Sequence, residues 1–478
     1  MKKASPWTWV VVTSCLVLIL GNGERLGGEP LGSQDTSNLP MKYRDHNLVL
    51  VSFDALQAAH VGCYGYPRMV TPFFDKIANK GFIFTNAMSV ASWTVPASMT
   101  WFTGVYPSEH RMTNKYAVYN EREKKLANLK ELSPELITLA DIMKDNGYAT
   151  GGFTGNAGVS GGFGYEQGFD TYYYPRGKFG SIEQSILRAT RWLQANKQTK
   201  FFLFLHGYDA HGQRTPTTGY DYRFVDPTYD KKYTGSELEQ EILREEGLEK
   251  GKLTLRDADV RFWRAIYDEK IQRMDTQFGK FLSTFEKLGL TDKTLFVLTS
   301  DHGTEFYEHR RFDHGFTLYN ELIHVPLAIK LPGQSNGKVI GDRISSIDVM
   351  PTILDLLDVQ IPAKARTQLR GTSLSSTMQG EQSTRNIFSE TDYRDYTFKR
   401  AIITPSGWKL IYTLEDQSRE LYYLPEDPGE TRNLAGTMAK RADQLQYQLF
   451  AHYKSIGQDL QGKTWKRGLK PVYRSQAK

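Results

Sequence analysis

The chain has 478 residues, of which 40% are hydrophobic and 24% charged, so it holds enough apolar material for a sizeable core and is not a disordered protein. Its net charge is only +6, and its Lys and Arg are scattered rather than gathered in a stripe, which argues against a nucleic-acid-binding protein. It has two cysteines, Cys15 and Cys63, which excludes a disulfide framework and a cysteine-rich zinc site.

The N-terminal segment predicts export. Lys2 and Lys3 precede a short apolar run, so residues 1–21 are interpreted as a secretory signal peptide or an uncleaved N-terminal anchor. Residues 22–45 are interpreted as a linker. We therefore expect a periplasmic or extracellular protein whose membrane contact, if it has one, is made by the N-terminal segment.

The chain then alternates predicted strands and helices. Apolar runs of strand length at 46–56, 81–89, 201–206, 294–299 and 323–333 are separated by helical patterns at 71–80, 133–147, 181–196, 259–290 and 345–359. This alternation predicts a mostly parallel sheet with helices on both faces. Residues 213–260 are polar and turn-rich, and we interpret them as a lid-like insertion. After about residue 385 the pattern switches to apolar–polar alternation, which predicts a small antiparallel sheet followed by a helix.

Polar residues follow the predicted strands. They are Asp54 after the first strand, Asp301 and His302 after a later one, and His206, Asp209 and His211 in between. Each residue alone could be structural. Ligands of such sheets bind at the carboxyl ends of the strands, however, so the residues are expected to gather there. Carboxylates, imidazoles and one hydroxyl form a ligand set that suits Zn²⁺ or Mn²⁺.

The hydroxyl belongs to Thr94, in the stretch "ASWTVPASMTWFTGVYPSEHRM" (91–112). A divalent cation lowers the pKa of a bound hydroxyl by many units, so Thr94 could become an alkoxide nucleophile. The helix predicted to follow near Pro96 would offer backbone N–H groups to an anionic ester.

From Asn47 to about Tyr453 the sequence resembles the sulfatase branch of the alkaline phosphatase superfamily. The blocks that carry the resemblance are "SFDALQAAHVGCYGYPRMVTPFFDKIANKGFIFTNAMS", "TGVYPSEHRM", "GYDAHG", "SDHGTEFYEHRRFDHGFTLYNELIHVPLAI", "SIDVMPTILDLL" and "GWKLIYTLEDQSRELYYLPEDPGETRNL". The resemblance implies an alkaline-phosphatase-like three-layer α/β/α fold with a mostly parallel central sheet. It also implies a catalytic domain over 46–380, a small C-terminal α/β subdomain with an antiparallel sheet over 381–478, and a bound divalent metal.

The chain departs from the family pattern at the nucleophile. Sulfatases carry a Cys or Ser that is oxidised to formylglycine, whereas Thr94 holds this position and Ser98 replaces the motif's Arg. No formylglycine is therefore expected. Ala55 replaces a second Asp, His302 replaces an Asn, and His314 aligns with a Lys, which favours Zn²⁺ or Mn²⁺ over Ca²⁺.

Threonine is the nucleophile of the superfamily's phosphodiesterases and phospho-head-group transferases. By this resemblance Asp54, Thr94, Asp301 and His302 are metal ligands. Thr94, His211 and His314 are the predicted catalytic residues, and Asp209, His211 and His314 are predicted to bind the substrate or a second ion. We interpret His309, Arg310 and Arg311 as lid or loop residues, and Cys63 and Lys330 as structural residues.

The sequence therefore predicts a metal-dependent hydrolase of sulfate or phosphate esters with a Thr nucleophile. The expected substrate is an anionic ester of a glycan, a lipid or a small molecule. Two alternatives stay open: a phosphodiesterase or phospho-head-group transferase acting on a glycan or lipid, and a non-catalytic sulfatase-like binding protein. The leaving group, the choice between one metal and two, and the oligomeric state are not determined by the sequence.

Overall fold

The computed structural model describes residues 39–113, 119–120, 125–126, 132–155, 157–161, 163–175, 180–211, 221–251, 253–393 and 397–461. The predicted signal or anchor, the linker up to residue 38, and residues 213–220 of the predicted insertion lie outside these ranges, as do residues 462–478. Within the described ranges, no helix is both long and apolar enough to cross a membrane.

The order of elements follows the predicted alternation. The strands are β1 (Asn47–Phe53), β2 (Phe82–Met88), β3 (Tyr119–Asn120), β4 (Lys125–Leu126), β5 (Ala149–Phe153), β6 (Thr171–Tyr173), β7 (Phe201–Gly207), β8 (Thr294–Thr299), β9 (Glu305–Phe306), β10 (Phe312–Asp313), β11 (His324–Val325), β12 (Leu327–Lys330), β13 (Lys338–Ser345), β14 (Ile387–Tyr393), β15 (Thr397–Ile403), β16 (Trp408–Thr413) and β17 (Arg419–Tyr423). The helices are α1 (Pro72–Ala78), α2 (Thr94–Thr103), α3 (Pro107–His110), α4 (Leu139–Asp145), α5 (Ile182–Asn196), α6 (Glu237–Lys250), α7 (Asp257–Lys287), α8 (Asn320–Ile323), α9 (Val349–Leu356), α10 (Ala363–Gln368), α11 (Ser375–Met378) and α12 (Ala439–Ser455).

The central sheet has the order β11-β2-β12-β8-β1-β7-β5-β6, and β13 pairs with β2. The strands from β8 to β6 run parallel to one another, whereas β12 is antiparallel to both of its neighbours. This confirms the predicted mostly parallel sheet. The single strand predicted over 323–333 is interrupted at Pro326, which has no N–H to donate to a strand ladder, so β11 and β12 are separate strands.

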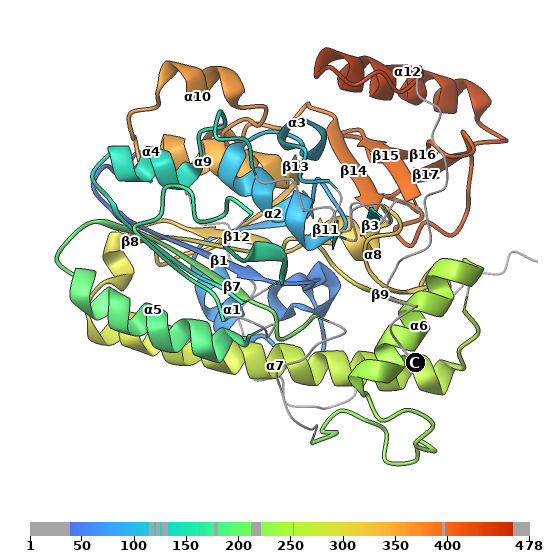
Figure 1. The fold of residues 1–478 in the computed structure, drawn as a ribbon, viewed down its shortest axis with the longest axis horizontal. Helices are drawn as coiled ribbons and strands as arrows, with labels where there is room; N and C mark the ends of the chain where they lie inside the picture. Colours follow the sequence, from blue (N-terminus) through green and yellow to red (C-terminus); the bar gives the residue numbers. More distant parts are fainter. Residues whose placement is uncertain are drawn as a thin grey trace, which may run out of the picture. The chain divides into compact units, whose positions relative to one another are not determined.

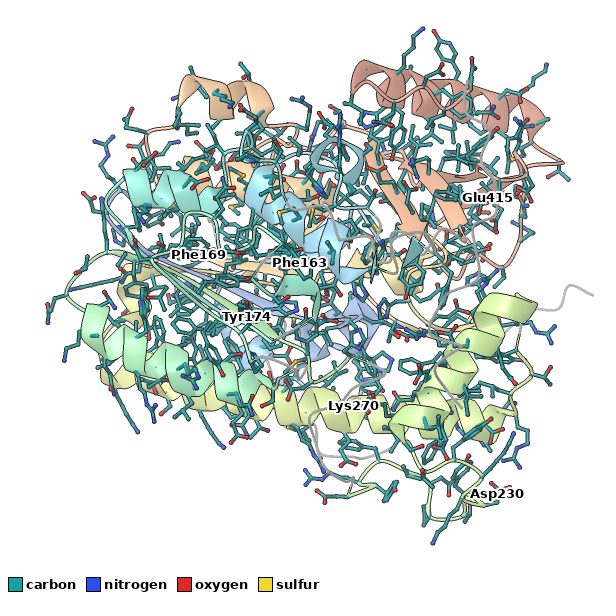
Figure 2. All side chains as sticks on the ribbon, viewed as in Figure 1. Phe163, Phe169, Tyr174, Asp230, Lys270 and Glu415 are labelled. Atoms are coloured by element: carbon teal, nitrogen blue, oxygen red, sulfur yellow. The ribbon has the colours of Figure 1, made fainter. Side chains whose placement is uncertain are left out.

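The core lies on both faces of this sheet because side chains alternate along a strand. In β1, Leu48 and Leu50 pack with α2, α4 and α9, whereas Val49 and Val51 pack with α1, α5 and α7. Figure 1 shows α4 and α9 on one side of the sheet and α5 and α7 on the other. Figure 2 marks the first face with Phe169, which lies between α4 and the sheet, and labels Lys270 on α7. The predicted three-layer α/β/α arrangement is confirmed.

The C-terminal part contains the predicted antiparallel sheet, with strand order β14-β15-β16-β17. Buried Leu410 and Leu421 pack against Leu445 and Leu449 of α12. The end of β14 approaches the segment that carries Thr94, because the ring of Tyr393 contacts Trp93 edge to face at 5.7 Å. The boundary near residue 380 and the lid role of 213–260 stay predictions. In the described part of the latter, residues 237–250 form α6, and residues 257–260 are the first turn of α7.

Candidate active site

Three neighbouring strands end at the same edge of the sheet. Ser52 of β1 lies opposite His206 of β7 on one side and Thr299 of β8 on the other. Asp54 follows β1 and therefore lies beside His206 of β7. Asp301 and His302 follow β8, the neighbour of β1 on the other side. Their side chains are fully buried. This register explains how residues about 95 to 250 positions apart meet at one place.

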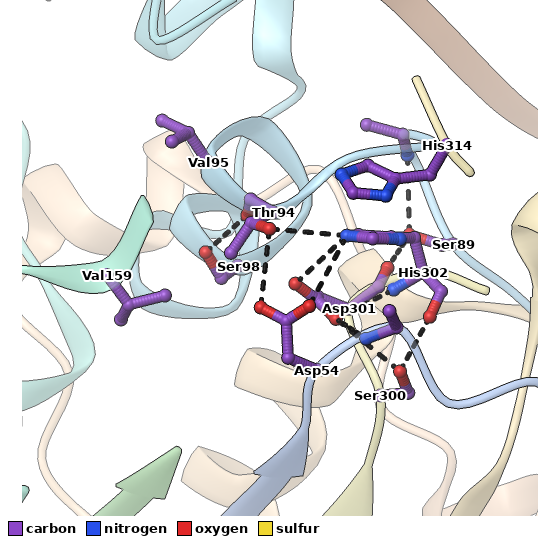
Figure 3. Close-up of polar contacts among 12 residues, drawn as sticks. Asp54, Ser89, Thr94, Val95, Ser98, Val159, Ser300, Asp301, His302 and His314 are labelled. Atoms are coloured by element: carbon purple, nitrogen blue, oxygen red, sulfur yellow. Dashed lines mark hydrogen bonds and ion pairs between the residues drawn. The ribbon is translucent and has the colours of Figure 1, made fainter. Parts of the chain in front are cut away.

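Thr94 completes this group, which we call the Asp54 cluster (Asp54, Thr94, His206, Asp301 and His302). Thr94 is the first residue of α2, and its Oγ1 lies 3.4 Å from Asp54 Oδ2 and 3.2 Å from His302 Nε2 (Figure 3). The residue before it, Trp93, is extended, so the chain enters the helix directly over the sheet edge. The hydroxyl and the first free amides of α2 consequently face the same region.

Close packing holds the Thr94 side chain in place. Gly158 leaves room for the Thr94 methyl group, because a Cβ at residue 158 would lie 2.7 Å from Thr94 Cγ2. A branched side chain has few allowed χ1 rotamers, so contact on the methyl side directs the hydroxyl toward the acids and imidazoles. Gly158 is far from Thr94 in the sequence, and sequence reasoning missed it.

Ser98, which stands where the motif has an Arg, contacts the backbone and a tyrosine. Ser98 Oγ donates to the Thr94 carbonyl at 2.5 Å and lies 2.8 Å from Tyr165 Oη. Tyr165 Oη in turn donates to the Val95 carbonyl at 2.9 Å. A buried tyrosine therefore supports the first turn of α2 here.

The two carboxylates of the cluster are held differently. Asp301 Oδ1 accepts the N–H groups of Ala55 at 3.1 Å and of His302 at 3.0 Å. Among the described residues, Asp301 Oδ2 accepts no hydrogen bond, and it lies 3.5 Å from His302 Nε2. Asp54 Oδ2 lies 3.1 Å from His206 Nε2. Buried carboxylate oxygens are normally hydrogen-bonded, so Asp301 Oδ2 is suited to a cation.

The tautomer of His302 follows from its surroundings. Its Nδ1 lies 2.6 Å from the Gly303 carbonyl oxygen, which can only accept, so Nδ1 carries the proton. Burial lowers the pKa of His302, although Asp301 and Asp54 oppose the change, and burial lowers the pKa of His206 to about 4. Both rings are therefore neutral near pH 7, the form in which imidazole binds metals.

The predicted histidines His211 and His314 lie beside this cluster. The ring of His314 lies 4.3 Å from that of His302 and 4.9 Å from that of His211. His314 Nδ1 forms an ion pair with Asp313, and Asp313 Oδ2 lies 3.9 Å from Arg244 Nε of α6. Burial would raise the pKa of Asp313, but the charges of His314 and Arg244 outweigh it and hold the pKa below its usual value.

Asp209 contacts the protein backbone, and its predicted role in binding the substrate or a second ion stays a prediction. Its Oδ2 accepts the N–H of Ile182 at 2.7 Å, so the carboxylate anchors the first residue of α5. Burial raises the pKa of Asp209 to about 6. Nearby, Lys270 of α7 lies 3.4 Å from the His211 carbonyl and 3.3 Å from Gln240 Oε1 of α6, which connects α6 and α7 to the site.

The cluster fits a divalent cation. Asp54, His206 and Asp301 each offer a ligand atom, and these atoms lie within 4.8 Å of one another. Thr94 and His302 border the same space, and a mixed oxygen and nitrogen set suits Zn²⁺ or Mn²⁺. The structure thus brings together the four predicted ligands, Asp54, Thr94, Asp301 and His302. His206 was absent from that prediction, although its place at a strand end was the signal that could have included it.

Sequence comparisons place the chain among characterised relatives. The family described as Sulfatase matches residues 46–359, and the description "N-sulphoglucosamine sulphohydrolase, C-terminal" matches residues 307–458. An N-acetylglucosamine-6-O-sulfatase from Bacteroides thetaiotaomicron is 23% identical, with 91% of each chain covered. The match to arylsulfatase K of Bos taurus, 28% identical over 206 residues, covers 42% of this chain and only 38% of that protein.

Solved structures share the fold. A 2-O GAG sulfatase superposes with a TM-score of 0.70 at 19% identity, over 90% of this chain and 100% of the other. A phosphonate monoester hydrolase from Silicibacter pomeroyi superposes with a TM-score of 0.64 at 21% identity, over 86% and 96% of the two chains.

Proposed function

This chain belongs to the sulfatase family, and from that premise we propose that it hydrolyses anionic sulfate or phosphate esters with Thr94 as the nucleophile. We propose that Asp54, His206, Asp301 and His302 hold a divalent cation, Zn²⁺ or Mn²⁺, beside Thr94, and that no formylglycine is formed. The observation that supports this most directly is the contact of Thr94 Oγ1 with both Asp54 Oδ2 and His302 Nε2.

A bound cation would lower the pKa of the Thr94 hydroxyl and neutralise part of the ester's charge. The protein's own contribution starts with the Thr94 proton, for which Asp54 Oδ2 is an acceptor in place, whereas the Nε2 lone pair of His302 is used by the cation. The amides of Thr94 and Val95 at the start of α2 would hold the ester's non-bridging oxygens, since the helix N-terminus favours negative charge. Because these residues are buried, water is largely excluded from the nucleophile.

His314 and His211 act on the other side of the ester in this proposal. His314 Nδ1 forms an ion pair with Asp313, and in this proposal His314 Nε2 donates to an ester oxygen. Thr94 Oγ1 forms the new bond to phosphorus or sulfur, and the bond to the leaving alcohol breaks as that alcohol takes a proton from a histidine. Water then attacks the same phosphorus or sulfur atom and gives a proton to the histidine that had lost one, while the bond to Thr94 Oγ1 breaks and Thr94 takes back the proton held by Asp54.

The central atom of the ester could be sulfur or phosphorus. The names of the relatives favour sulfur, and N-acetylglucosamine-6-O-sulfatase in particular suggests a sulfated glycan. Thr94 favours phosphorus, because formylglycine hydrate has a second hydroxyl that expels sulfate by C–O cleavage and threonine has none. A transferase that passes a phospho-head group to a glycan or lipid would use the same first step. Export to the periplasm or the cell exterior is part of the proposal.

A substrate panel tests the proposal. The metal-stripped protein would be assayed with 4-nitrophenyl sulfate, bis(4-nitrophenyl) phosphate and phenyl phosphonate esters, each with Zn²⁺ or Mn²⁺ added. We expect metal-dependent turnover of at least one ester, and a mass adduct on the peptide that contains Thr94 after rapid quenching. A metal-loaded protein with no turnover and no adduct would favour the non-catalytic binding role instead.

A further inference from the structure

A second group of metal-binding residue types lies outside the Asp54 cluster. Glu305 in β9, His309 in the turn before β10, and Glu321 in α8 each offer one ligand atom, and these atoms lie within 4.8 Å of one another. We call these three residues the Glu305 cluster. Glu305 is fully buried and the side chains of His309 and Glu321 are 15% and 8% exposed, so the group is not a solvated acidic patch.

The His309 ring is held in the orientation that a metal ligand needs. Its Nε2 lies 3.1 Å from the Glu430 carbonyl oxygen, which fixes a proton on Nε2. Its Nδ1 therefore faces Glu321 Oε1, at 2.6 Å, and its face stacks on Tyr319 with ring centroids 3.6 Å apart. Histidines that bind metals commonly donate their second ring N–H to a backbone carbonyl in this way.

Glu305 supplies an independent observation. Its Oε1 accepts the N–H groups of His309 at 2.9 Å and of Arg311 at 2.8 Å. Its Oε2 is buried and has no hydrogen-bond partner among the described residues. Burial and the neighbouring charges of Glu321 and Glu308 raise the pKa of Glu305 to about 8. An unsatisfied buried carboxylate oxygen is costly, and a cation between Glu305 and Glu321 would remove that cost.

The His60–Asp268 pair serves as a comparison for the Glu305 cluster. His60 Nδ1 lies 2.7 Å from Asp268 Oδ1, a distance similar to that of the His309–Glu321 pair. Asp268 Oδ2, however, accepts from Tyr66 Oη and from Arg68, both at 2.6 Å. That pair is neutralised and satisfied by protein groups, whereas the Glu305 cluster keeps an oxygen without a donor.

We propose that Glu305, His309 and Glu321 form a second divalent-cation site, with Zn²⁺ as the preferred ion. One imidazole and two carboxylates are ligands that zinc accepts. The role is structural in this proposal, because the three side chains are at most 15% exposed. The ion would join the β9–β10 hairpin to α8, while His309 keeps its contact with the Glu430 carbonyl. Asp313 is the last residue of β10 and His314 follows it. Without the ion, a proton shared by His309 and Glu321 takes its place.

Zinc stoichiometry tests this proposal separately from the proposed function. The full chain would be stripped with a chelator, dialysed against ZnCl₂ alone and analysed for zinc per chain. We expect two equivalents for the native protein and one each for Asp54→Asn/Asp301→Asn and Glu305→Gln/Glu321→Gln. The control Glu135→Gln/Glu286→Gln, which alters two exposed carboxylates paired with lysines, should keep both ions.

The zinc contents of these variants distinguish the second zinc site from the proposed active-site cation. Unchanged zinc content in Glu305→Gln/Glu321→Gln overturns the second site, as does an Asp54→Asn/Asp301→Asn protein that binds none. One equivalent in the native protein that is lost only with Glu305→Gln/Glu321→Gln supports the second site and counts against the active-site cation. If Glu305→Gln/Glu321→Gln does not fold, Co²⁺ added to Asp54→Asn/Asp301→Asn decides: a visible d–d absorption at one equivalent supports the site, and no uptake overturns it.

Discussion

The Asp54 cluster and the Glu305 cluster use the same residue types for different ends. Both combine buried carboxylates with an imidazole whose other nitrogen bonds a backbone carbonyl, Gly303 in one case and Glu430 in the other. Only the Asp54 cluster has a hydroxyl at the start of a helix of ten residues. The Glu305 cluster faces the stacked ring of Tyr319 instead. The ligands alone therefore allow a cation to bind, and the neighbouring nucleophile and amides decide whether that cation can do chemistry.

The largest expected effect comes from removing that nucleophile. Thr94→Val keeps the branched shape but has no hydroxyl, and we expect kcat/KM to fall by about 10³-fold or more. Steady-state assays on the best substrate of the panel measure the loss. Thr103→Val, on the same helix with its hydroxyl bonded only locally to Met99, should change activity little. Full turnover by Thr94→Val would place the nucleophile elsewhere.

The second largest loss of activity is expected from weakening the cation site. Asp54→Asn removes a ligand charge, and we expect about a 10²-fold loss of activity that added Zn²⁺ or Mn²⁺ partly restores. Activity measured against metal concentration shows this as a shift to higher metal. Glu305→Gln should change the dependence of activity on metal concentration very little, and this would distinguish the two clusters. A curve for Asp54→Asn that matches the native protein contradicts the assignment.

A smaller loss is expected from disturbing the position of Thr94. Gly158→Ala places a methyl group 2.7 Å from Thr94 Cγ2, so the Thr94 side chain must move. We expect kcat to fall by about 10- to 100-fold, with the fold retained. Gly341→Ala is the matched control, because a Cβ there meets nothing within 4 Å. Equal kcat values for the two variants would show that the contact does not position the nucleophile.

The smallest effect concerns stability at the Glu305 cluster. Burial would lower the pKa of His309, but the hydrogen bond and charge of Glu321 outweigh it and raise the pKa to about 9. An unfolded histidine has a pKa of about 6.5, so the protonated pair stabilises the metal-free protein fully below that pH. The contribution is lost as the pH rises through about 9.

Glu321→Gln should therefore destabilise the metal-free protein by about 1–3 kcal/mol at pH 6 and by much less at pH 10. Urea unfolding in the presence of a chelator measures the difference, with Glu286→Gln as the exposed control. A difference that is equally large at both pH values would mean that the His309 charge does not contribute.

Much of the fold could be predicted because local patterns encode it. The run predicted as a strand over 46–56 contains β1, and the helical pattern over 259–290 corresponds to α7. The antiparallel strands expected after residue 385 are also present. The proximity of Asp54 to Asp301 and His302 could also be predicted, because the carboxyl ends of parallel strands lie at the same edge of a sheet. Gly158 and Tyr165 could not be predicted, since their contacts with α2 depend on how distant loops pack. The same holds for His309, which the sequence indicated only as a lid or loop residue.

The sequence by itself determined the strand and helix order, the antiparallel C-terminal sheet and which acids and imidazoles stand at strand ends. Hydrophobic periodicity sets these features residue by residue, so they need no knowledge of distant contacts. Only the tertiary structure decided that His206 joins the cluster, that Asp209 bonds the backbone of α5, and that Glu305 meets His309 and Glu321. Such contacts depend on strand register and loop packing, which bring together residues that no local pattern connects.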